Sequence, residues 1–247
     1  MSMCKSTIFA LINDNYCMNN IKIDVVIPVF NEAKAVSKVI GEIPKDLVRH
    51  IIICDNGSTD DTAVTASTMG AVVVYEPIKG YGNACLKGLE YIKTLDELPD
   101  IVVFLDGDYS DYPIEMYQIV NPIIYDGYDL VIGSRALGEM ERGAMMPQQL
   151  FGNWLATSLI KLFYKYQFTD LGPFRGVRYE ALQLINMQDR TFGWTVEMQV
   201  KAAKLKMKTK EVAVNYRRRI GTSKVSGTVK GTILAGHKIL WTIFKYM

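Results

Sequence analysis

The chain has 247 residues, and 49% of them are hydrophobic, so one large domain can bury a substantial core. A formal net charge of only +2, with no low-complexity stretch, excludes a disordered chain and a general nucleic-acid-binding protein. The four cysteines form no C-x-x-C pair, and neither a signal peptide nor an apolar run of membrane-spanning length is present. We therefore expect reduced cysteines and a cytoplasmic protein.

The first half of the chain alternates continuous apolar runs with segments of helical periodicity. Residues 1–21 show no clear period and are expected to form an N-terminal tail. Strands are then predicted at 22–29, 48–54, 71–75, 101–105 and 129–132, and helices at 32–43, 59–69, 83–95 and 113–125. Such alternation predicts an α/β fold with a Rossmann-like, mainly parallel central sheet and helices on both faces.

The second half of the chain is less regular. Helices are predicted at 150–163, 195–205 and 230–247, and a strand at 208–216. Residues 168–177 are expected to form an irregular strand or loop that crosses the functional site. The lysines between 201 and 210 are interpreted as a solvated face.

Polar residues follow the predicted strands where each strand ends. Glu32 follows the first strand, Asp55 the second, Asp106 the fourth and Arg135 the fifth. In a mainly parallel sheet, ligands bind beyond the carboxyl ends of the strands. The sequence therefore predicts one polar site along this edge of the sheet.

Asp106 and Asp108 are the candidate metal ligands. Two carboxylates two residues apart in a turn can hold a hard divalent cation that also bridges a diphosphate. The alternative is purely structural, since Asp-Gly is a common turn after a strand. The position of the pair at the predicted edge favours the metal site.

Three further segments carry candidate contacts. Asp55 to Asp60 can offer polar groups to a base or ribose, although the segment also suits a helix N-terminus. Lys79, followed by Gly80-Tyr81-Gly82, can present a cation and helix amides to phosphate, and the alternative is a simple loop. Residues 217–224 concentrate four cations with glycine and hydroxyl groups, which favours a phosphate clamp over a solvated linker.

These motifs together resemble the inverting family 2 glycosyltransferases with the GT-A fold. The resemblance is greatest to the group that includes dolichyl-phosphate mannose synthase and its bacterial polyprenyl-phosphate relatives. It covers roughly residues 22–230 and rests on shared order and spacing. The matching segments are IPVFNE at 27–32, DNGSTD at 55–60, LDGD at 105–108, GSR at 133–135, TDLGPFR at 169–175, Glu197-Met198 and GTSK at 221–224.

The resemblance implies transfer of a sugar from a UDP- or GDP-sugar to a polyprenyl- or dolichyl-phosphate type of lipid, with inversion and with Mg²⁺ or Mn²⁺. It implies catalytic roles for Asp108, Asp170 and Arg218, metal contacts by Asp106, Asp108 and Ser110, and an organising role for Glu197. The implied donor contacts, with Lys79 added from the phosphate argument, are Pro28, Phe30, Glu32, Cys54, Asp55, Asn56, Lys79, Asp106, Gly107, Asp108, Arg135, Arg218 and Lys224.

The sequence departs from the family at three places. Asn56 stands where the family often has a second acid, Ser110 ends an unusual metal loop, and Gly172-Pro173 alters the acceptor motif. The acceptor therefore stays open between a lipid phosphate and a hydroxyl, for which Asp170 would be the base. A sugar nucleotidyltransferase is disfavoured, because the first strand is not followed by a glycine-rich basic loop. A non-catalytic nucleotide-sugar-binding module is the remaining alternative.

The last segment, 231–247, is predicted to be an amphipathic helix beyond the GT-A domain of residues 22–230. Its apolar residues and interspersed lysines suit a membrane surface, so a peripheral position on the cytoplasmic face of a membrane is one expectation. The alternative is a helix that packs on the domain, on a second copy or on a membrane-protein partner.

Overall fold

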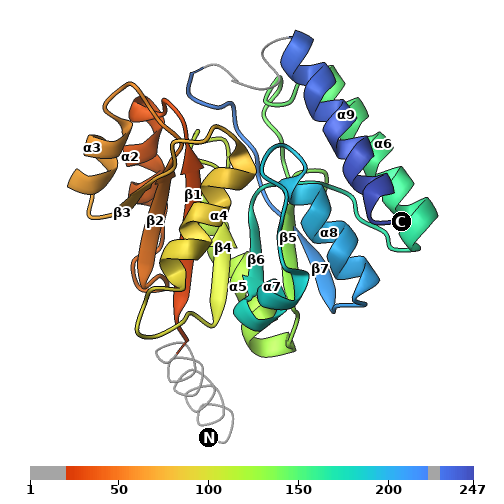
Figure 1. Ribbon diagram of the computed structural model, residues 1–247, viewed down its shortest axis with the longest axis horizontal. Coiled ribbons are helices and arrows are strands. Elements are labelled where there is room, and N and C mark those ends of the chain that lie inside the picture. Colours follow the sequence, from red (N-terminus) through yellow and green to blue (C-terminus); the bar gives the residue numbers. More distant parts are fainter. Residues whose placement is uncertain (1–20, 222–228) are drawn as a thin grey trace, which may run out of the picture.

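The computed structural model describes residues 21–221 and 229–247, and its first half follows the predicted alternation (Figure 1). Every strand and helix predicted up to residue 134 is present, with ends shifted by a few residues. The elements are β1 (Ile23–Val29), α2 (Ala33–Glu42), β2 (His50–Asp55), α3 (Thr62–Thr68), β3 (Val72–Tyr75), α4 (Tyr81–Ile92), β4 (Ile101–Phe104), η1 (Pro113–Glu115), α5 (Met116–Asp126) and β5 (Leu130–Ser134).

The second half adds two elements that the sequence left undefined. The elements are α6 (Pro147–Tyr164), β6 (Arg175–Arg178), α7 (Tyr179–Ile185), α8 (Trp194–Lys204), β7 (Thr209–Ala213) and α9 (Val229–Lys245). The short helix α7 was not predicted, and β6 occupies the end of the segment predicted as an irregular strand or loop. Residues 1–20, predicted as a tail, lie outside the described residues.

The seven strands form one sheet in the order β3-β2-β1-β4-β6-β5-β7. β6 runs antiparallel to β4 and β5, and the other pairs are parallel. The prediction of a mainly parallel sheet is confirmed. Because the parallel strands end at the same edge, the turns after β1, β2 and β4 lie next to one another.

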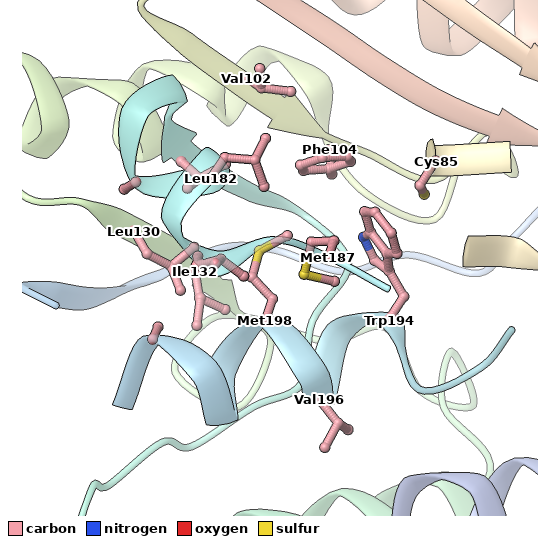
Figure 2. Close-up of a cluster of buried hydrophobic side chains, with 14 of the residues drawn as sticks. Cys85, Val102, Phe104, Leu130, Ile132, Leu182, Met187, Trp194, Val196 and Met198 are labelled. Carbon is pink, nitrogen blue, oxygen red and sulfur yellow. The ribbon is translucent and has the colours of Figure 1, made fainter. Parts of the chain in front are cut away.

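Hydrophobic cores cover both faces of the sheet. Successive strand residues point to opposite faces, so Val25 belongs to the core that includes residues of α2, α3 and α5, while Val26 belongs to the core that includes residues of α4 and α8. On the second face, Trp194 of α8 meets Phe104 of β4 edge to face, with ring centroids 5.7 Å apart (Figure 2). This contact joins the end of β4 to the start of α8.

Helices α6 and α9 lie side by side at one end of the molecule, where both also contact α8 (Figure 1). Polar contacts fasten α9 to the domain. The Tyr246 hydroxyl donates to Glu197 Oε1 at 2.6 Å, and Lys238 Nζ lies 2.9 Å from Asp189 Oδ2. The predicted C-terminal helix therefore packs on the domain through one face. No helix in the described ranges is long and apolar enough to cross a membrane.

Candidate active site

The turn that follows β4 carries Asp106 and Asp108 into a cleft. The hydroxyl of Tyr81 donates to Asp106 Oδ1 at 2.9 Å. The backbone N–H and the hydroxyl of Ser110 both donate to Asp108 Oδ1, at 2.9 and 2.5 Å. A Cβ atom on Gly107 would lie only 2.5 Å from Val29 Cγ1, so glycine lets the turn pack directly on β1. Both carboxylates are thus fixed by their neighbours.

Carboxyl groups crowd this turn. Burial and, secondly, the charge of Asp108 raise the pKa of Asp106 to about 7. Asp111 is only 2% exposed, and burial followed by the charges of Asp106 and Asp108 raises its pKa well above the usual range. Among the described residues, neither carboxyl oxygen of Asp111 has a hydrogen-bond partner that meets the usual distance and angle. The excess of acidic groups favours a bound cation. Sequence reasoning missed Asp111, although the Asp106-Asp108-Asp111 spacing was a visible signal.

The three consecutive arginines have different surroundings. Arg219 places Nη1 3.0 Å from Asp108 Oδ2 and Nη2 2.9 Å from Glu32 Oε1, so it links two predicted site residues. Arg218 is exposed and donates to the carbonyl of Arg142.

Arg217 stacks on Tyr109 and Tyr112 and pairs with Glu42. Its role is structural. The structure therefore brings Arg219, which belongs to the predicted phosphate clamp but was not singled out in it, to the acidic turn, and leaves Arg218 apart from it. Lys224 lies outside the described residues.

Asn56 ties the strand end of β2 to the segment that precedes α4. Its Nδ2 donates to the carbonyls of Glu76 and Ile78, at 3.0 and 2.8 Å. Its Oδ1 accepts the N–H of Gly80 at 2.7 Å. A carboxylate at position 56 could accept the last bond but could not donate the other two. These three hydrogen bonds explain why asparagine stands at this position, without any contact with the nucleotide base of the donor.

Lys79 and Phe30 meet in the same region. Lys79 Nζ lies 3.6 Å from the centre of the Phe30 ring and donates to the carbonyls of Asn56 and Gly57, at 2.7 and 2.8 Å. Asp55 Oδ1 accepts the N–H of Ser58 at 2.9 Å, which shapes the following turn. These contacts gather Phe30, Asp55, Asn56 and Lys79 in one place.

Two other predicted donor contacts differ in exposure. Pro28 is partly exposed at the end of β1. Cys54 is fully buried, and a Cβ atom on Gly88 of α4 would lie 2.6 Å from its Sγ. The Cys54 side chain therefore belongs to the core, so the predicted contact of this residue with the base cannot come from its thiol. Burial also raises the pKa of its thiol.

The glycine-rich turn before α4 is a packing element. A Cβ atom on Gly80 would lie 2.2 Å from the Arg190 carbonyl oxygen, and one on Gly82 would lie 2.0 Å from that of Asp189. The N–H groups of Gly82 and Asn83 donate to the carbonyls of Thr191 and Arg190. These amides are therefore already used, and the simple-loop alternative describes the turn.

Glu197 supports the same loop. It is fully buried, and it accepts hydrogen bonds from the N–H groups of Gln188 and Asp189. It also pairs with Lys201 at 2.7 Å. Glu197 therefore holds the backbone at the start of residues 188–193, a loop whose Phe192 lines the cleft described below.

Arg135, which lines the cleft, pairs with the buried carboxylate of Asp170. Arg135 Nε and Nη2 each donate to one carboxylate oxygen of Asp170 at 2.7 Å, and the Arg135 N–H adds a third bond at 2.8 Å. Glu211 accepts the N–H of Asp170, and Gln199 donates to its carbonyl. Both Asp170 carboxylate oxygens are thus committed to holding Arg135.

A cleft of about 490 Å³ is lined by only some of these groups, and its lining residues do not include Phe30, Asp55, Asn56, Lys79 or Asp170. Its polar wall holds Asp106, Asp108, Arg135 and Arg219, and its apolar wall comes from α6 and α9, including Phe151, Leu155, Ile239 and Leu240. A second cavity, of about 580 Å³ between α4 and α7, contains none of the predicted site residues. The smaller cleft is therefore the candidate active site.

The oxygen donors of this cleft fit a hard metal ion. No three His, Cys, Asp or Glu side chains in the described part of the chain converge on one point, so the protein offers a pair of carboxylates instead of a full cage. Mg²⁺ is commonly held by one or two carboxylates together with substrate phosphates. The contact of Arg219 with Asp108 shows that this carboxylate attracts a cation. The residues therefore fit an ion shared between the protein and a diphosphate.

Comparisons with known proteins agree with this geometry. The family model described as Glycosyl transferase family 2 matches residues 24–185. The chain is 33% identical over 215 residues to an uncharacterized glycosyltransferase of Mycobacterium tuberculosis, covering 86% of this chain and 94% of that relative. It is 29% identical over 215 residues to a dolichyl-phosphate hexose transferase of Haloferax volcanii, covering 85% and 89% of the two chains.

A solved structure shares the fold. Glucosyl-3-phosphoglycerate synthase from Mycobacterium tuberculosis, in complex with Mn²⁺, uridine diphosphate and phosphoglyceric acid, superposes with a TM-score of 0.73 at 21% identity. The match covers 94% of this chain and 80% of that one. Fold, acidic turn and relatives agree, and the chain belongs to glycosyltransferase family 2 as an enzyme with the GT-A fold.

Proposed function

We propose that the protein transfers a sugar from a nucleotide diphosphate sugar to a lipid phosphate, with inversion at the anomeric carbon. The observation that carries the proposal is the position of Arg135 in the cleft of Asp106 and Asp108, beside an apolar wall. A cation at this place suits an acceptor phosphate, and the apolar wall suits the lipid chain attached to it.

The donor is expected on the side formed by the turns after β1, β2 and β4, which we call the donor side. Phe30, Asp55, Asn56 and Lys79 would contact the nucleoside, and the diphosphate would reach Asp106 and Asp108. A bound Mg²⁺ or Mn²⁺ would neutralise the charge that develops on the leaving diphosphate. The solved relative that binds Mn²⁺ and uridine diphosphate supports this arrangement.

Arg135, Asp170 and the apolar wall form what we call the acceptor side. A phosphate acceptor is already an anion, so its attack on the sugar needs alignment more than it needs a base. Asp170 suits that task, because its bidentate pair with Arg135 fixes the guanidinium in one orientation. The dolichyl-phosphate hexose transferase among the relatives supports a lipid phosphate acceptor.

A hydroxyl acceptor is the second candidate. The observation in its favour is the carboxylate of Asp170 itself, since a hydroxyl nucleophile requires a base. Use of Asp170 as a base would first require its release from Arg135. The phosphate acceptor therefore agrees better with the observed contacts.

The donor and metal requirements can be tested together. The protein would be incubated with UDP- and GDP-sugars, Mn²⁺ or Mg²⁺, and a short-chain polyprenyl phosphate, and products would be identified by mass spectrometry. We expect one donor to yield a glycosyl phospholipid, and chelation of the metal to abolish the product. Donor binding without any transfer or hydrolysis would instead indicate a non-catalytic binding module.

A further inference from the structure

Large apolar side chains gather on the outward faces of α6 and α9. Trp154 on α6 is 61% exposed and Trp241 on α9 is 56% exposed. The other exposed apolar residues of the two helices include Leu150, Phe151, Leu162, Phe163, Leu234 and Phe244. Aromatic side chains of this size are rarely left in water in such numbers without a binding partner.

The spacing shows that these residues form continuous helix faces. On α6, Leu150, Trp154 and Leu162 recur at intervals of four and eight, while Ala156 and Ile160 on the other side are buried. On α9, the exposed positions Leu234, Trp241 and Phe244 recur at intervals of seven and three. Each helix therefore buries one apolar face and exposes another, unlike an ordinary surface helix.

The two faces join into one surface. Phe163 of α6 and Phe244 of α9 meet edge to face, with ring centroids 5.5 Å apart, and the helices lie side by side (Figure 1). We call the exposed apolar residues of both helices the α6–α9 face. The sequence indicates a possible membrane-facing side only for the C-terminal helix, so the contribution of α6 comes from the structure.

The charge of this region has one sign. The sequences of α6 and α9 contain no aspartate or glutamate, Lys161 and Lys245 are exposed, and Lys238 pairs with Asp189. Lys165, at the C-terminal end of α6, is also exposed. Apolar and aromatic groups with flanking lysines match an anionic lipid surface, whose headgroups attract basic residues near the membrane.

The α6–α9 face also adjoins the cleft. Phe151 and Leu155 of α6 and Ile239 and Leu240 of α9 line the apolar wall that leads to Asp106 and Arg135. A molecule held with its hydrocarbon part at this face could therefore place a polar head beside the acidic turn.

We propose that the α6–α9 face docks the protein on the surface of an anionic lipid bilayer, with Trp154 and Trp241 inserted at the interface. The docking rests on this surface alone, and only its use in presenting the acceptor rests on the proposed function. A second copy of the chain fits less well, because a two-fold contact through the same face would bring its lysines together with no acid on either helix to pair with them.

The three tryptophans of the chain allow a direct test. Trp154 and Trp241 lie on the proposed surface, whereas Trp194 is 1% exposed in the core and serves as an internal reference. The full chain and its Trp241→Phe variant would be mixed with phosphatidylcholine vesicles, with or without phosphatidylglycerol, that carry bromine on their acyl chains. We expect the emission of Trp154 and Trp241 to be quenched, with binding about tenfold tighter to the vesicles that contain phosphatidylglycerol.

Two results would overturn the docking. The first is the absence of quenching with either vesicle while the protein remains folded. The second is protection of Trp154 from iodide in a stable dimer without vesicles, which would show that a second copy covers the face.

Two leucines of nearly equal exposure, one on the α6–α9 face and one outside it, test whether vesicle binding depends on this face or on any exposed apolar side chain. Leu162 on α6 is 68% exposed and Leu184 on α7 is 70% exposed. In vesicle flotation, the double variant Trp154→Ser, Leu162→Ser should lose about tenfold in vesicle affinity, since each buried CH₂ contributes to membrane binding. Leu184→Ser should bind like the unmodified protein. Equal loss in both variants would contradict the proposal.

The same variants test the membrane docking separately from the proposed transfer reaction. Transfer to a water-soluble, short-chain polyprenyl phosphate should be unchanged in Trp154→Ser, Leu162→Ser, because neither residue lines the cleft. Loss of vesicle binding with retained transfer supports the docking. If no transfer occurs even in the unmodified protein, the catalytic proposal fails, and the quenching result still decides the docking.

Discussion

The donor side of the cleft is built from turns that directly follow strands, whereas the acceptor side joins residues far apart in the chain. Asp108 is oriented by Ser110 two positions away, and Asp55 accepts from Ser58 three positions away. Arg135 and Asp170 are 35 positions apart, and the apolar wall combines α6 with α9. Local motifs thus form the proposed donor side, and long-range packing forms the proposed acceptor side.

This difference between local motifs and long-range packing explains which features of the fold and the site could be predicted from the sequence. Continuous apolar strands and the Asp106-Gly107-Asp108 turn are local patterns, so the parallel sheet and the acidic edge were predictable. The position of Arg219 was not predictable, because three consecutive arginines cannot be told apart by sequence. The contacts of Arg217 with Tyr109 and Glu42 appear only in the folded structure. The burial of the Cys54 side chain was not predictable either, because a strand residue next to the site can still point into the core.

The largest effect is expected on the donor side, at Asp108. Asp108→Asn keeps the shape of the side chain but removes the charge that would hold a metal ion. We expect a loss of at least about 100-fold in turnover, comparable to the removal of a main electrostatic group in other enzymes. Calorimetric titration with Mn²⁺ should show a matching loss of affinity. Normal metal binding in this variant would show that the ion is held elsewhere.

The pH dependence of metal binding tests whether burial and the neighbouring carboxyl group of Asp108 raise the pKa of Asp106. The pKa of Asp106 is raised to about 7, so below that pH a proton competes with the metal. Affinity for Mn²⁺ should therefore fall by up to about tenfold for each pH unit below 7, and level off above it. Without metal, the raised pKa means that Asp106 disfavours the folded state increasingly as pH rises from about 4 to 7. Asp106→Asn should then raise the Tm of the metal-free protein at pH 8 but not at pH 4.

On the acceptor side, Asp170→Asn separates an orienting role from that of a base. The amide weakens the pair with Arg135, so KM for the acceptor should rise by about tenfold while kcat changes less. Arg135→Lys should behave similarly, because lysine cannot form the bidentate pair. A large fall in kcat, with loss of the acidic limb of the pH profile, would instead identify Asp170 as a base.

The adjacent arginines provide a matched comparison. Arg219→Ala removes the link between Asp108 and Glu32, and we expect a severalfold loss in kcat/KM together with weaker donor binding. Arg218→Ala should have a smaller effect, because its guanidinium contacts only the Arg142 carbonyl within the described residues. The reverse order of effects would support the sequence-based assignment of Arg218 and would mean that the segment rearranges when substrate binds.

The smallest effect on chemistry is expected at Asn56. Asn56→Asp removes two donors from the carbonyls of Glu76 and Ile78 and should destabilise the fold by about 1–3 kcal/mol. Thermal unfolding should show a lower Tm, whereas the preference between UDP- and GDP-sugars should not change. Asn186→Asp, at an exposed position, is the control. A switch of base preference would show that Asn56 reads the base.

The identity of the nucleophile tests the account most directly. Transfer would be measured from the accepted donor to a short-chain polyprenyl phosphate and to the matching polyprenol, which differs only in its hydroxyl end. The arrangement of Arg135 and Asp170 predicts transfer to the phosphate, none to the alcohol, and retained transfer to the phosphate by Asp170→Asn at saturating acceptor. Efficient transfer to the alcohol, abolished by Asp170→Asn, would contradict the proposed acceptor chemistry.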